Sequence, residues 1–553
     1  MTESIRKSWQ EILTQTQTLL EDGLHHALVQ SIRASLHLGI SLHEFEMLFQ
    51  LLQTKSIITW LELPNAVVVY SDLMLKTRRF DEALNFIRTR VTKDERLLVF
   101  QALALLRTNQ PVEAFNTIEQ VVTFEHQTGV WWRVKAEIMY SLGLPDWQAA
   151  FAQASQKLTE RPLGLCLIEW GVALERDLRH AQARECWTQA LVILEKDRYY
   201  QAVTTYNLGL SCARELKLQE AEDYFAKLEK FSRHKAVRMF ETRAWSGFGL
   251  AWRAVGEFTR AEHAYQKATR CAIEPEDKRQ AWVGLGHTLR LAGQTSSALT
   301  ALRHALGIEN QAVSRVYVDL AVAQYANGNA QSALISLEKT GQLFGEDLER
   351  KHLLLAEMAR IQGDANSALE TIQKVRLHSL WAREELQAFP GLKTLLLAME
   401  QTIPEALPRV TRLKVEVFAR GALRVRVNGR NINLAPTSRA AEILVLLLEH
   451  ENQRSMLKLI ADLFGEQSRD ALNPKRKLIS KAIRQLKDAL GWEGSVIEGA
   501  GLYRLDTEQT QWTYDIAQAV FNGEVVSNFL EGVDSNWAVE RARALSQTLL
   551  IVN

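Results

Sequence analysis

The chain has 553 residues, of which 47% are hydrophobic and 24% are charged, the balance of a globular protein with about three to four domains. Its 10 prolines and 28 glycines are too few for a collagen-like or Pro/Gly-rich disordered chain, and the formal net charge of +1 favours no class of partner. No apolar run approaches the roughly 18–20 residues of a membrane span, and the first ten residues lack the apolar stretch of a signal peptide. We therefore expect a cytoplasmic protein without a membrane segment.

A pattern of residues repeats through the first three quarters of the chain. Its clearest copies begin at Trp245, Trp282, Tyr317 and Leu355. Two copies have identical offsets, with Phe248, Gly249, Trp252, Gly256, Ala261, Tyr265 and Ala268 in one and Leu285, Gly286, Leu289, Gly293, Ala298, Leu302 and Ala305 in the other. Looser copies upstream contain Gly171 with Ala183 and Trp187, Ala114 with Ile118, and Ala83 with Ile87.

Each copy of this pattern has two apolar stripes at helical spacing, separated by a turn that contains glycine. Small residues allow two helices to approach closely, and large residues fill the space between neighbouring helix pairs. One pair cannot bury its apolar face alone, so the pairs stack. The pattern resembles the tetratricopeptide repeat, which implies an α-solenoid over residues 60–400 that binds a protein or peptide. Residues 1–59 are expected to form a helical region or cap.

The pattern changes after Pro404 and Pro408, so residues 401–412 are expected to be a linker. Residues 413–418 and 422–427 alternate apolar and polar residues, and Asn428-Gly429 supplies a turn, which predicts a small antiparallel sheet. Three helices are expected next, one from near Pro436, one over 456–464 and one over about 473–490. Residues 496–505 predict a β-hairpin with a glycine-rich tip.

This order of strands, three helices and a hairpin resembles the winged helix-turn-helix of OmpR/PhoB-type regulators, and within that class the SARP/AfsR group of bacterial transcriptional regulators. The resemblance covers residues 413–505, and its motifs are Ala440-Ala441-Glu442-Ile443-Leu444, Gln485-Leu486-Lys487-Asp488-Ala489-Leu490-Gly491 and Gly501-Leu502-Tyr503-Arg504-Leu505. Residues 506–553 resemble the start of the helical activation domain of that group, although the chain ends before such a domain would be complete. The expected fold class is mainly α, a solenoid followed by a small α+β winged helix-turn-helix domain.

The third helix of this domain has two distinct faces on a helical wheel. Ile479, Ile483, Leu486 and Leu490 lie on one side and predict the face packed on the core. A helix with polar and basic residues on its other side fits the major groove of double-stranded DNA. The candidate DNA-binding residues on that side are Asn473, Lys477, Ser480, Lys481, Arg484 and Lys487. A basic helix face that is merely solvated is the alternative reading.

The hairpin supplies the candidate wing. Gly499 and Gly501 permit a tight turn at its tip, and Arg504 is the nearest cation. The resemblance implies that the wing touches the minor groove or the DNA backbone. Residues 409–505 contain 18 basic and 10 acidic residues, residues 506–553 contain 2 and 7, and the first 408 contain 46 and 48. The basic excess is thus concentrated in the segment that resembles a DNA-binding domain.

The sequence offers little for an enzyme, a metal or a cofactor. It contains neither a Gly-x-x-x-x-Gly-Lys-Ser/Thr phosphate loop nor a Gly-x-Ser-x-Gly elbow, and His43-Glu44 lacks the second histidine of a zincin. The cysteines Cys166, Cys186, Cys212 and Cys271 have no Cys-x-x-Cys spacing, so we expect small buried residues in a reducing compartment. No catalytic, metal-binding or cofactor-binding residue is assigned.

The leading hypothesis is a bacterial transcriptional regulator. Its winged helix binds a promoter, its solenoid receives a protein, a peptide or a second copy of the chain, and it contacts RNA polymerase. The alternative is a tetratricopeptide scaffold or adaptor whose winged helix binds a protein. A third interpretation is a peptide-sensing regulator like the quorum-sensing repeat proteins, but those carry their DNA-binding domain at the N-terminus.

Overall fold

The computed structural model describes residues 2–36, 42–53, 62–63, 65–89, 94–123, 127–308, 314–341, 343, 345–398, 412–465, 472–499 and 501–547. The chain forms two compact units, one of Met1–Ser211 with Lys230–Arg238, the other of Cys212–Glu229 with Met239–Asn553. Trp60 and, apart from Arg412, the predicted linker at 401–412 lie outside the described residues. None of the described helices combines the length and the apolar character needed to cross a membrane.

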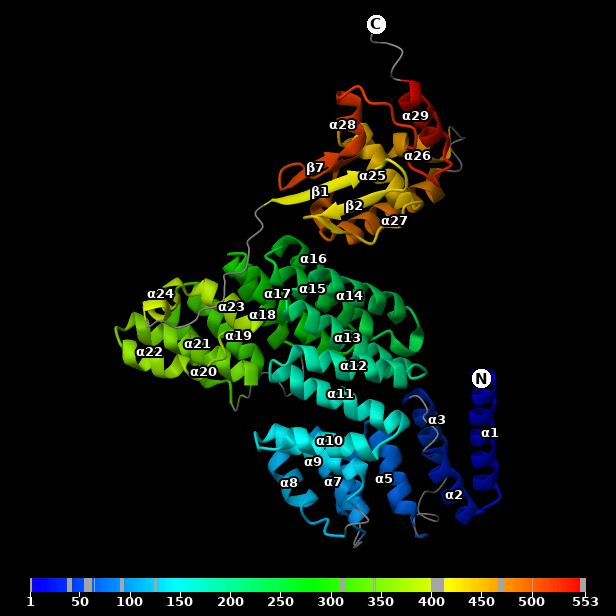
Figure 1. Ribbon diagram of the computed structural model, residues 1–553, viewed down its shortest axis with the longest axis vertical. Coiled ribbons are helices and arrows are strands. Elements are labelled where there is room, and N and C mark those ends of the chain that lie inside the picture. Colours follow the sequence, from blue (N-terminus) through cyan, green and yellow to red (C-terminus); the bar gives the residue numbers. More distant parts are fainter. Residues whose placement is uncertain are drawn as a thin grey trace. The chain divides into compact units, whose positions relative to one another are not determined.

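The first unit consists of helices that follow one another as antiparallel pairs (Figure 1). In the region 1–59, predicted to be a helical region or cap, the described residues form three helices. The buried ring of Trp187 lies where a side chain on Gly171 would project. The missing side chain allows α11 (Glu160–Arg176) and α12 (His180–Ile193) to approach closely, as the repeat pattern predicts. The helices of this part are α1 (Thr2–Glu21), α2 (His25–Ser35), α3 (Leu42–Gln53), α5 (Ala66–Lys76), α6 (Phe80–Arg88), α7 (Glu95–Arg107), α8 (Pro111–Ile118), α9 (Gly129–Ser141), α10 (Trp147–Lys157), α11 (Glu160–Arg176), α12 (His180–Ile193) and α13 (Arg198–Arg214).

The second unit continues with the four clear repeats, each of which is a helix pair. Gly256, Gly293, Gly328 and Gly363 join the helices of the pairs, with φ between +76° and +86°, a conformation that favours glycine. The tetratricopeptide-like fold predicted from the spacing is therefore confirmed. The helices are α14 (Leu218–Ser232), which like α13 includes residues of both units, and α15 (Phe240–Ala254), α16 (Phe258–Cys271), α17 (Pro275–Leu291), α18 (Thr295–Leu306), α19 (Ser314–Ala326), α20 (Ala330–Glu338), α21 (Gly345–Ile361) and α22 (Ala365–Ile372).

Two further helices follow the last pair, α23 (Leu380–Ala388) and α24 (Pro390–Ala398). Ser379 caps α23, since its Oγ accepts a hydrogen bond from the backbone amide of Ala382 at 3.3 Å. Trp381, Ala382 and Leu386 of α23 are buried in one apolar cluster with residues of α21. The repeat pattern does not extend to α23, so the sequence did not show where this helix packs.

The remainder of the second unit includes a small α+β domain whose elements follow the predicted order. The predicted helix from near Pro436 begins three residues later, after Ser438, whose side chain caps it. The elements are β1 (Leu413–Phe418), β2 (Arg424–Val427), β3 (Arg430–Asn431), α25 (Arg439–Glu449), β4 (Gln453–Ser455), α26 (Met456–Phe464), α27 (Leu472–Leu490), β5 (Val496–Gly499), β6 (Leu502–Leu505), β7 (Thr510–Tyr514), α28 (Asp515–Phe521) and α29 (Asn536–Gln547).

The first sheet of this domain differs from the purely antiparallel sheet that was predicted. Its strand order is β3-β2-β1-β7, and β7 pairs parallel to β1, with Leu413 opposite Thr510 and Val417 opposite Tyr514 (Figure 1). The second sheet has the order β4-β6-β5. Parallel pairing requires a long crossover, here the whole segment of three helices and a hairpin, and local alternation of residues does not reveal it.

Residues 506–547 therefore belong to the α+β domain, whereas the sequence predicted a separate helical tail. Besides the strand β7, they contribute Ile516, Leu530 and Leu545 to the apolar core that also holds Val415 and Leu444. None of the four cysteines forms a disulfide; Cys166, Cys186 and Cys212 are buried and Cys271 is partly exposed.

Candidate nucleic-acid interface

Helix α27 is amphipathic, and its apolar face is buried in the core of the α+β domain. Ile479, Ile483, Leu486 and Leu490 are each at most 4% exposed. Gly491 ends the helix with φ +99°, as expected of a C-terminal glycine. The inner face predicted from the helical wheel is confirmed.

The opposite face of α27 is exposed. Asn473, Lys477, Ser480, Lys481 and Arg484 all have exposed side chains on one 19-residue helix. The sixth candidate, Lys487, differs because its side chain is only 15% exposed and its Nζ lies 2.9 Å from Glu493 Oε1. The structure thus brings five candidates onto one accessible surface and places Lys487 in an ion pair at its margin.

The candidate wing is the hairpin of β5 and β6. Ile497 lies opposite Arg504 in its register, and Gly501 has φ +75° at the tip. Arg504 is exposed, whereas Tyr503, the next residue on the opposite face, is 2% exposed. Gly499, Gly501 and Arg504 are therefore accessible together, and Tyr503 is the core residue that alternation predicts.

Tyr503 also connects the wing to the candidate face of α27. Its hydroxyl donates to Glu498 Oε1 at 3.3 Å and interacts with the side chain of Ser480. Burial raises the pKa of Tyr503, although the hydrogen bond with Ser480 acts in the opposite direction. The Tyr503 phenol therefore stays neutral. Ser480 is exposed on α27 and also links this helix to the wing.

Helix α26 precedes α27 and is held by local polar contacts. The Ser455 side chain accepts from the backbone amide of Lys458 at 3.3 Å and caps α26. Arg454 of β4 donates to both carboxylate oxygens of Asp462 at 2.9 and 3.0 Å, a bidentate pair that joins the second sheet to α26. These contacts hold α26 in a fixed position relative to the second sheet.

Two exposed leucines on α26 and α27 were not singled out from the sequence. Leu457 of α26 is 56% exposed and Leu478 of α27 is 52% exposed. The sequence could have shown that Leu478 is exposed, because this leucine falls outside the buried stripe of α27 on the helical wheel. An exposed leucine fits a partner with an apolar surface, and it also fits a thymine methyl group in the major groove.

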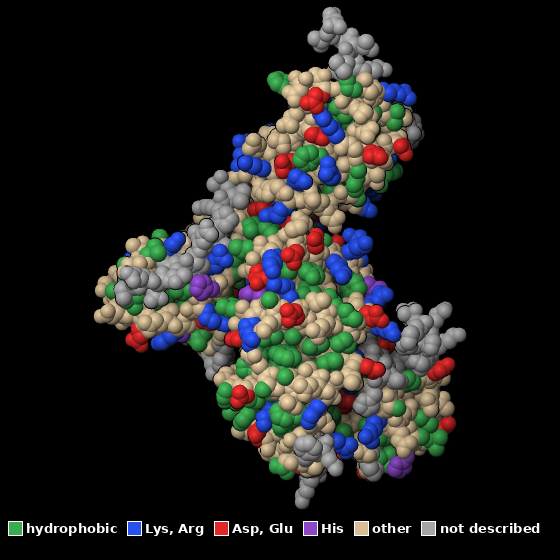
Figure 2. Space-filling view, in the orientation of Figure 1, with side chains coloured by type: hydrophobic (Ala, Val, Ile, Leu, Met, Phe, Trp, Pro, Cys, Tyr) green, Lys and Arg blue, Asp and Glu red, His purple; other side chains and the backbone are tan. Residues whose placement is uncertain are grey.

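The net charge of the whole α+β domain favours a nucleic-acid partner less strongly than the net charge of the predicted domain 409–505 did. Since residues 506–547 belong to the same domain, the segment 409–553 contains 20 basic and 17 acidic residues. On the face drawn in Figure 2, Lys and Arg side chains lie among Asp and Glu side chains. Basic side chains therefore gather on one face of α27, whereas the domain as a whole is nearly balanced in charge.

Among the described residues, no group of three or more His, Cys, Asp or Glu side chains is placed to share a metal ion. No family model matches the sequence, and no curated protein matches it. Among solved structures, one described as a functional characterization of PilF from Pseudomonas aeruginosa is 16% identical, covers 43% of this chain and 97% of its own, and has a TM-score of 0.28. A monomeric mutant of IFIT1 with m7Gppp-AAAA is 13% identical, covers 71% of this chain and 86% of its own, and has a TM-score of 0.36. At these TM-scores neither likeness bears on function.

Proposed function

We propose that this protein is a DNA-binding regulator in which α27 enters the major groove and the helical repeats bind a protein segment. The observation that carries the proposal is the exposed face of α27, where Lys477, Lys481 and Arg484 stand opposite a fully buried apolar stripe. The bacterial cytoplasmic setting, the contact with RNA polymerase and a second copy of the chain belong to the same proposal. No chemical step is assigned to the protein.

The residue types on this face match the two tasks of a recognition helix. The major groove, about 12 Å wide, admits a helix, and arginine or lysine pairs there with the acceptor edge of guanine. Asn473 at the start of α27 offers a donor and an acceptor for adenine. Lysines also neutralise phosphates, which makes the affinity depend on salt. The wing residues Gly501 and Arg504 would then lie near the DNA backbone.

The test measures DNA binding by the full chain to genomic fragments selected by the protein itself, using fluorescence anisotropy at several salt concentrations. Lys481→Ala is expected to weaken binding to all fragments and to reduce the salt slope by about one. Arg484→Ala is expected to cost about 1–3 kcal/mol if it reads a base edge. Lys414→Ala and Arg424→Ala are the matched controls. Both residues are exposed on the first sheet, and each substitution removes one positive charge, as the α27 substitutions do.

Equal losses in the controls and in the α27 variants would move the DNA-binding surface away from α27. Selection of no fragment at low salt would remove DNA binding from the proposal altogether.

A second candidate function is a repeat scaffold whose α+β domain binds a protein. The exposed Leu457 and Leu478 favour it, since exposed apolar side chains are typical of protein interfaces when they form a patch. This candidate predicts a partner that stays bound at high salt. It also predicts that Leu478→Asp releases that partner while Lys414→Ala does not.

A further inference from the structure

Each of the four clear repeats begins with one helix, namely α15, α17, α19 or α21. These first helices form one common face, and α23 of the same chain lies on it. Leu380 of α23 packs with Leu250 and Ala254 of α15. Trp381 and Leu386 pack with residues of α21. Stacked helix pairs build an extended surface on which such proteins bind their ligands. A segment of the chain therefore occupies the surface where a partner is expected.

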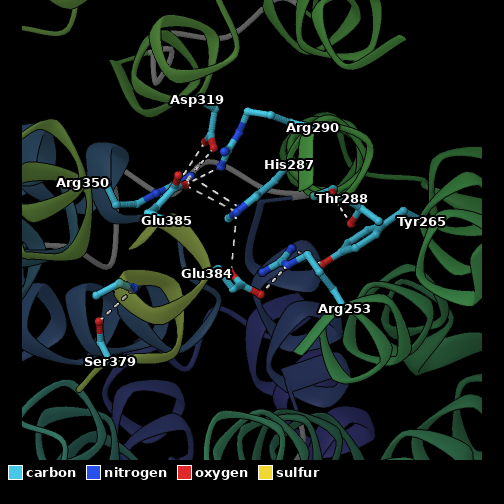
Figure 3. Close-up of polar contacts among 12 residues, drawn as sticks. Arg253, Tyr265, His287, Thr288, Arg290, Asp319, Arg350, Ser379, Glu384 and Glu385 are labelled. Atoms are coloured by element: carbon cyan, nitrogen blue, oxygen red, sulfur yellow. Dashed lines mark hydrogen bonds and ion pairs between the residues drawn. The ribbon is translucent and has the colours of Figure 1, made fainter. Parts of the chain in front are cut away.

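Two adjacent glutamates of α23 point into a cluster of arginines from these helices (Figure 3). Arg253 Nε donates to Glu384 Oε1 at 2.8 Å. Glu385 Oε1 accepts from Arg290 at 2.5 Å and from Arg350 at 3.3 Å. The side chains of both glutamates are 1% exposed. Three of the four helices, α15, α17 and α21, thus hold two carboxylates that follow one another in the sequence.

The charges on this face balance only when α23 is present. The repeat helices contribute the guanidinium groups of Arg253, Arg290 and Arg350 and the carboxylate of Asp319, which accepts from Arg350 at 3.2 Å. The neighbouring Arg315 and Asp347 pair with each other at 3.3 Å and add no net charge. His287 Nε2 lies 3.6 Å from Glu384 and 3.5 Å from Glu385, and burial together with the neighbouring arginines lowers its pKa well below the usual value. With His287 neutral, this set carries two positive charges in excess, and the two carboxylates of α23 neutralise them.

The match between α23 and the arginine cluster is incomplete in detail. One buried oxygen of Glu384, one of Glu385 and one terminal nitrogen of Arg290 have no hydrogen-bond partner among the described residues. A buried polar atom without a partner costs free energy, so this occupant does not use all the binding capacity of the site. A competing carboxylate pair with better geometry would bind more tightly.

We propose that the arginine cluster of Arg253, Arg290 and Arg350 is a binding site for an acidic helix of a partner protein. Helix α23 fills it as an internal competitor. The partner helix has two consecutive acidic residues, with an aromatic or aliphatic residue three positions before the first and an aliphatic residue directly after the second, as Trp381 and Leu386 lie around Glu384 and Glu385. Because α23 and α24 precede β1 in the chain, release of α23 lengthens the connection to the α+β domain. The inference rests on the repeats being a binding scaffold and is independent of DNA binding by α27.

The test uses the full chain and a fluorescent peptide with the sequence of residues 378–389. A tethered segment competes at a roughly millimolar effective concentration, so the peptide should bind the wild-type protein weakly. The double substitution E384Q/E385Q removes the charges of the internal competitor. It is expected to raise the affinity for the peptide at least tenfold and to speed hydrogen exchange of the α23 amides.

Two controls isolate the carboxylates. A peptide with glutamine in place of Glu384 and Glu385 should bind the double variant no more tightly than it binds the wild-type protein. The variant Glu370→Gln changes an exposed glutamate on α22, 77% accessible, and should bind the peptide as the wild-type protein does.

The proposal is overturned if α23 amides in the double variant stay as protected as those of α21 and the affinity for the peptide does not rise. In that case α23 is a fixed part of the core. If the double variant does not fold, the wild-type protein with excess peptide decides. Faster exchange in α23 but not in α22 supports displacement, and unchanged exchange in α23 rejects it. DNA affinity measured on the same samples tests the other proposal separately.

Discussion

At the scale of single residues, His287 of the second unit is a buried histidine with a strongly lowered pKa. It is 5% exposed and faces the carboxylates of Glu384 and Glu385 and the guanidinium of Arg350. Burial is the main cause of its lowered pKa, and Arg253, Arg350, Arg290 and Arg315 add to it. From the sequence it was one of several scattered histidines, because no local pattern shows that Arg253, Arg350 and the two glutamates, about 35 to 100 positions away, will surround it.

This environment predicts a pH effect on stability. As the pH falls below about 6.5, the unfolded chain protonates His287 while the folded protein does not, so the free energy of unfolding decreases. His287→Gln removes this titration. The loss of stability between pH 6.5 and 5.5 should then shrink by about 1 kcal/mol, as measured by urea unfolding at each pH. An unchanged pH slope in the variant would mean that His287 takes up its proton in the folded protein.

At the scale of elements, the packing of the repeats depends on glycines, because a glycine has no side chain to separate two helices. A side chain on Gly249 of α15 would project to within 2.6 Å of the ring of Tyr265 on α16, and the ring also lies where a side chain on Gly284 would project. The turn glycines have a different role, since Gly293 has φ +86° and no atom near its missing side chain. The pattern shows glycine at both kinds of position, and only the packing shows which constraint applies.

These two roles predict different responses to substitution. Gly249→Ala forces a methyl group against Tyr265 and should destabilise the protein by about 1–3 kcal/mol, even though alanine favours a helix. Gly293→Asn should cost less, because asparagine tolerates the left-handed conformation. Thermal unfolding of the two variants and the wild-type protein measures the difference. A Gly249→Ala protein as stable as the wild type would show that the ring of Tyr265 can move aside.

At the scale of the whole molecule, the α+β domain needs residues that lie beyond its hairpin. Strand β7 covers the edge of β1, and the Tyr514 hydroxyl donates to Glu449 of α25 at 2.6 Å. Leu530 and Leu545 belong to the same core. Chain positions about 100 residues apart thus complete one sheet and one core.

This arrangement predicts the effect of truncation. A chain that ends at Leu505 loses β7 and the buried Ile516, Leu530 and Leu545, each worth about 1.5–3 kcal/mol of burial, against a total stability of about 5–15 kcal/mol for a typical protein. The α+β domain should become sensitive to protease while the repeats stay resistant. A chain that ends at Gln547 is the control and should stay resistant throughout. Protected β1 amides in the shorter chain would show that the domain folds without β7.

The sequence by itself determined the repeat pairs, the order of the elements in the α+β domain and the two faces of α27. These features follow from local spacing, such as the 3.6-residue period that places Ile479, Ile483 and Leu486 on one side. Only the tertiary structure decided the parallel pairing of β7 with β1 and the burial of Glu384 and Glu385 among arginines of three other helices. The reason is physical, because such contacts join distant residues through burial and charge balance, and no local period of the chain records them.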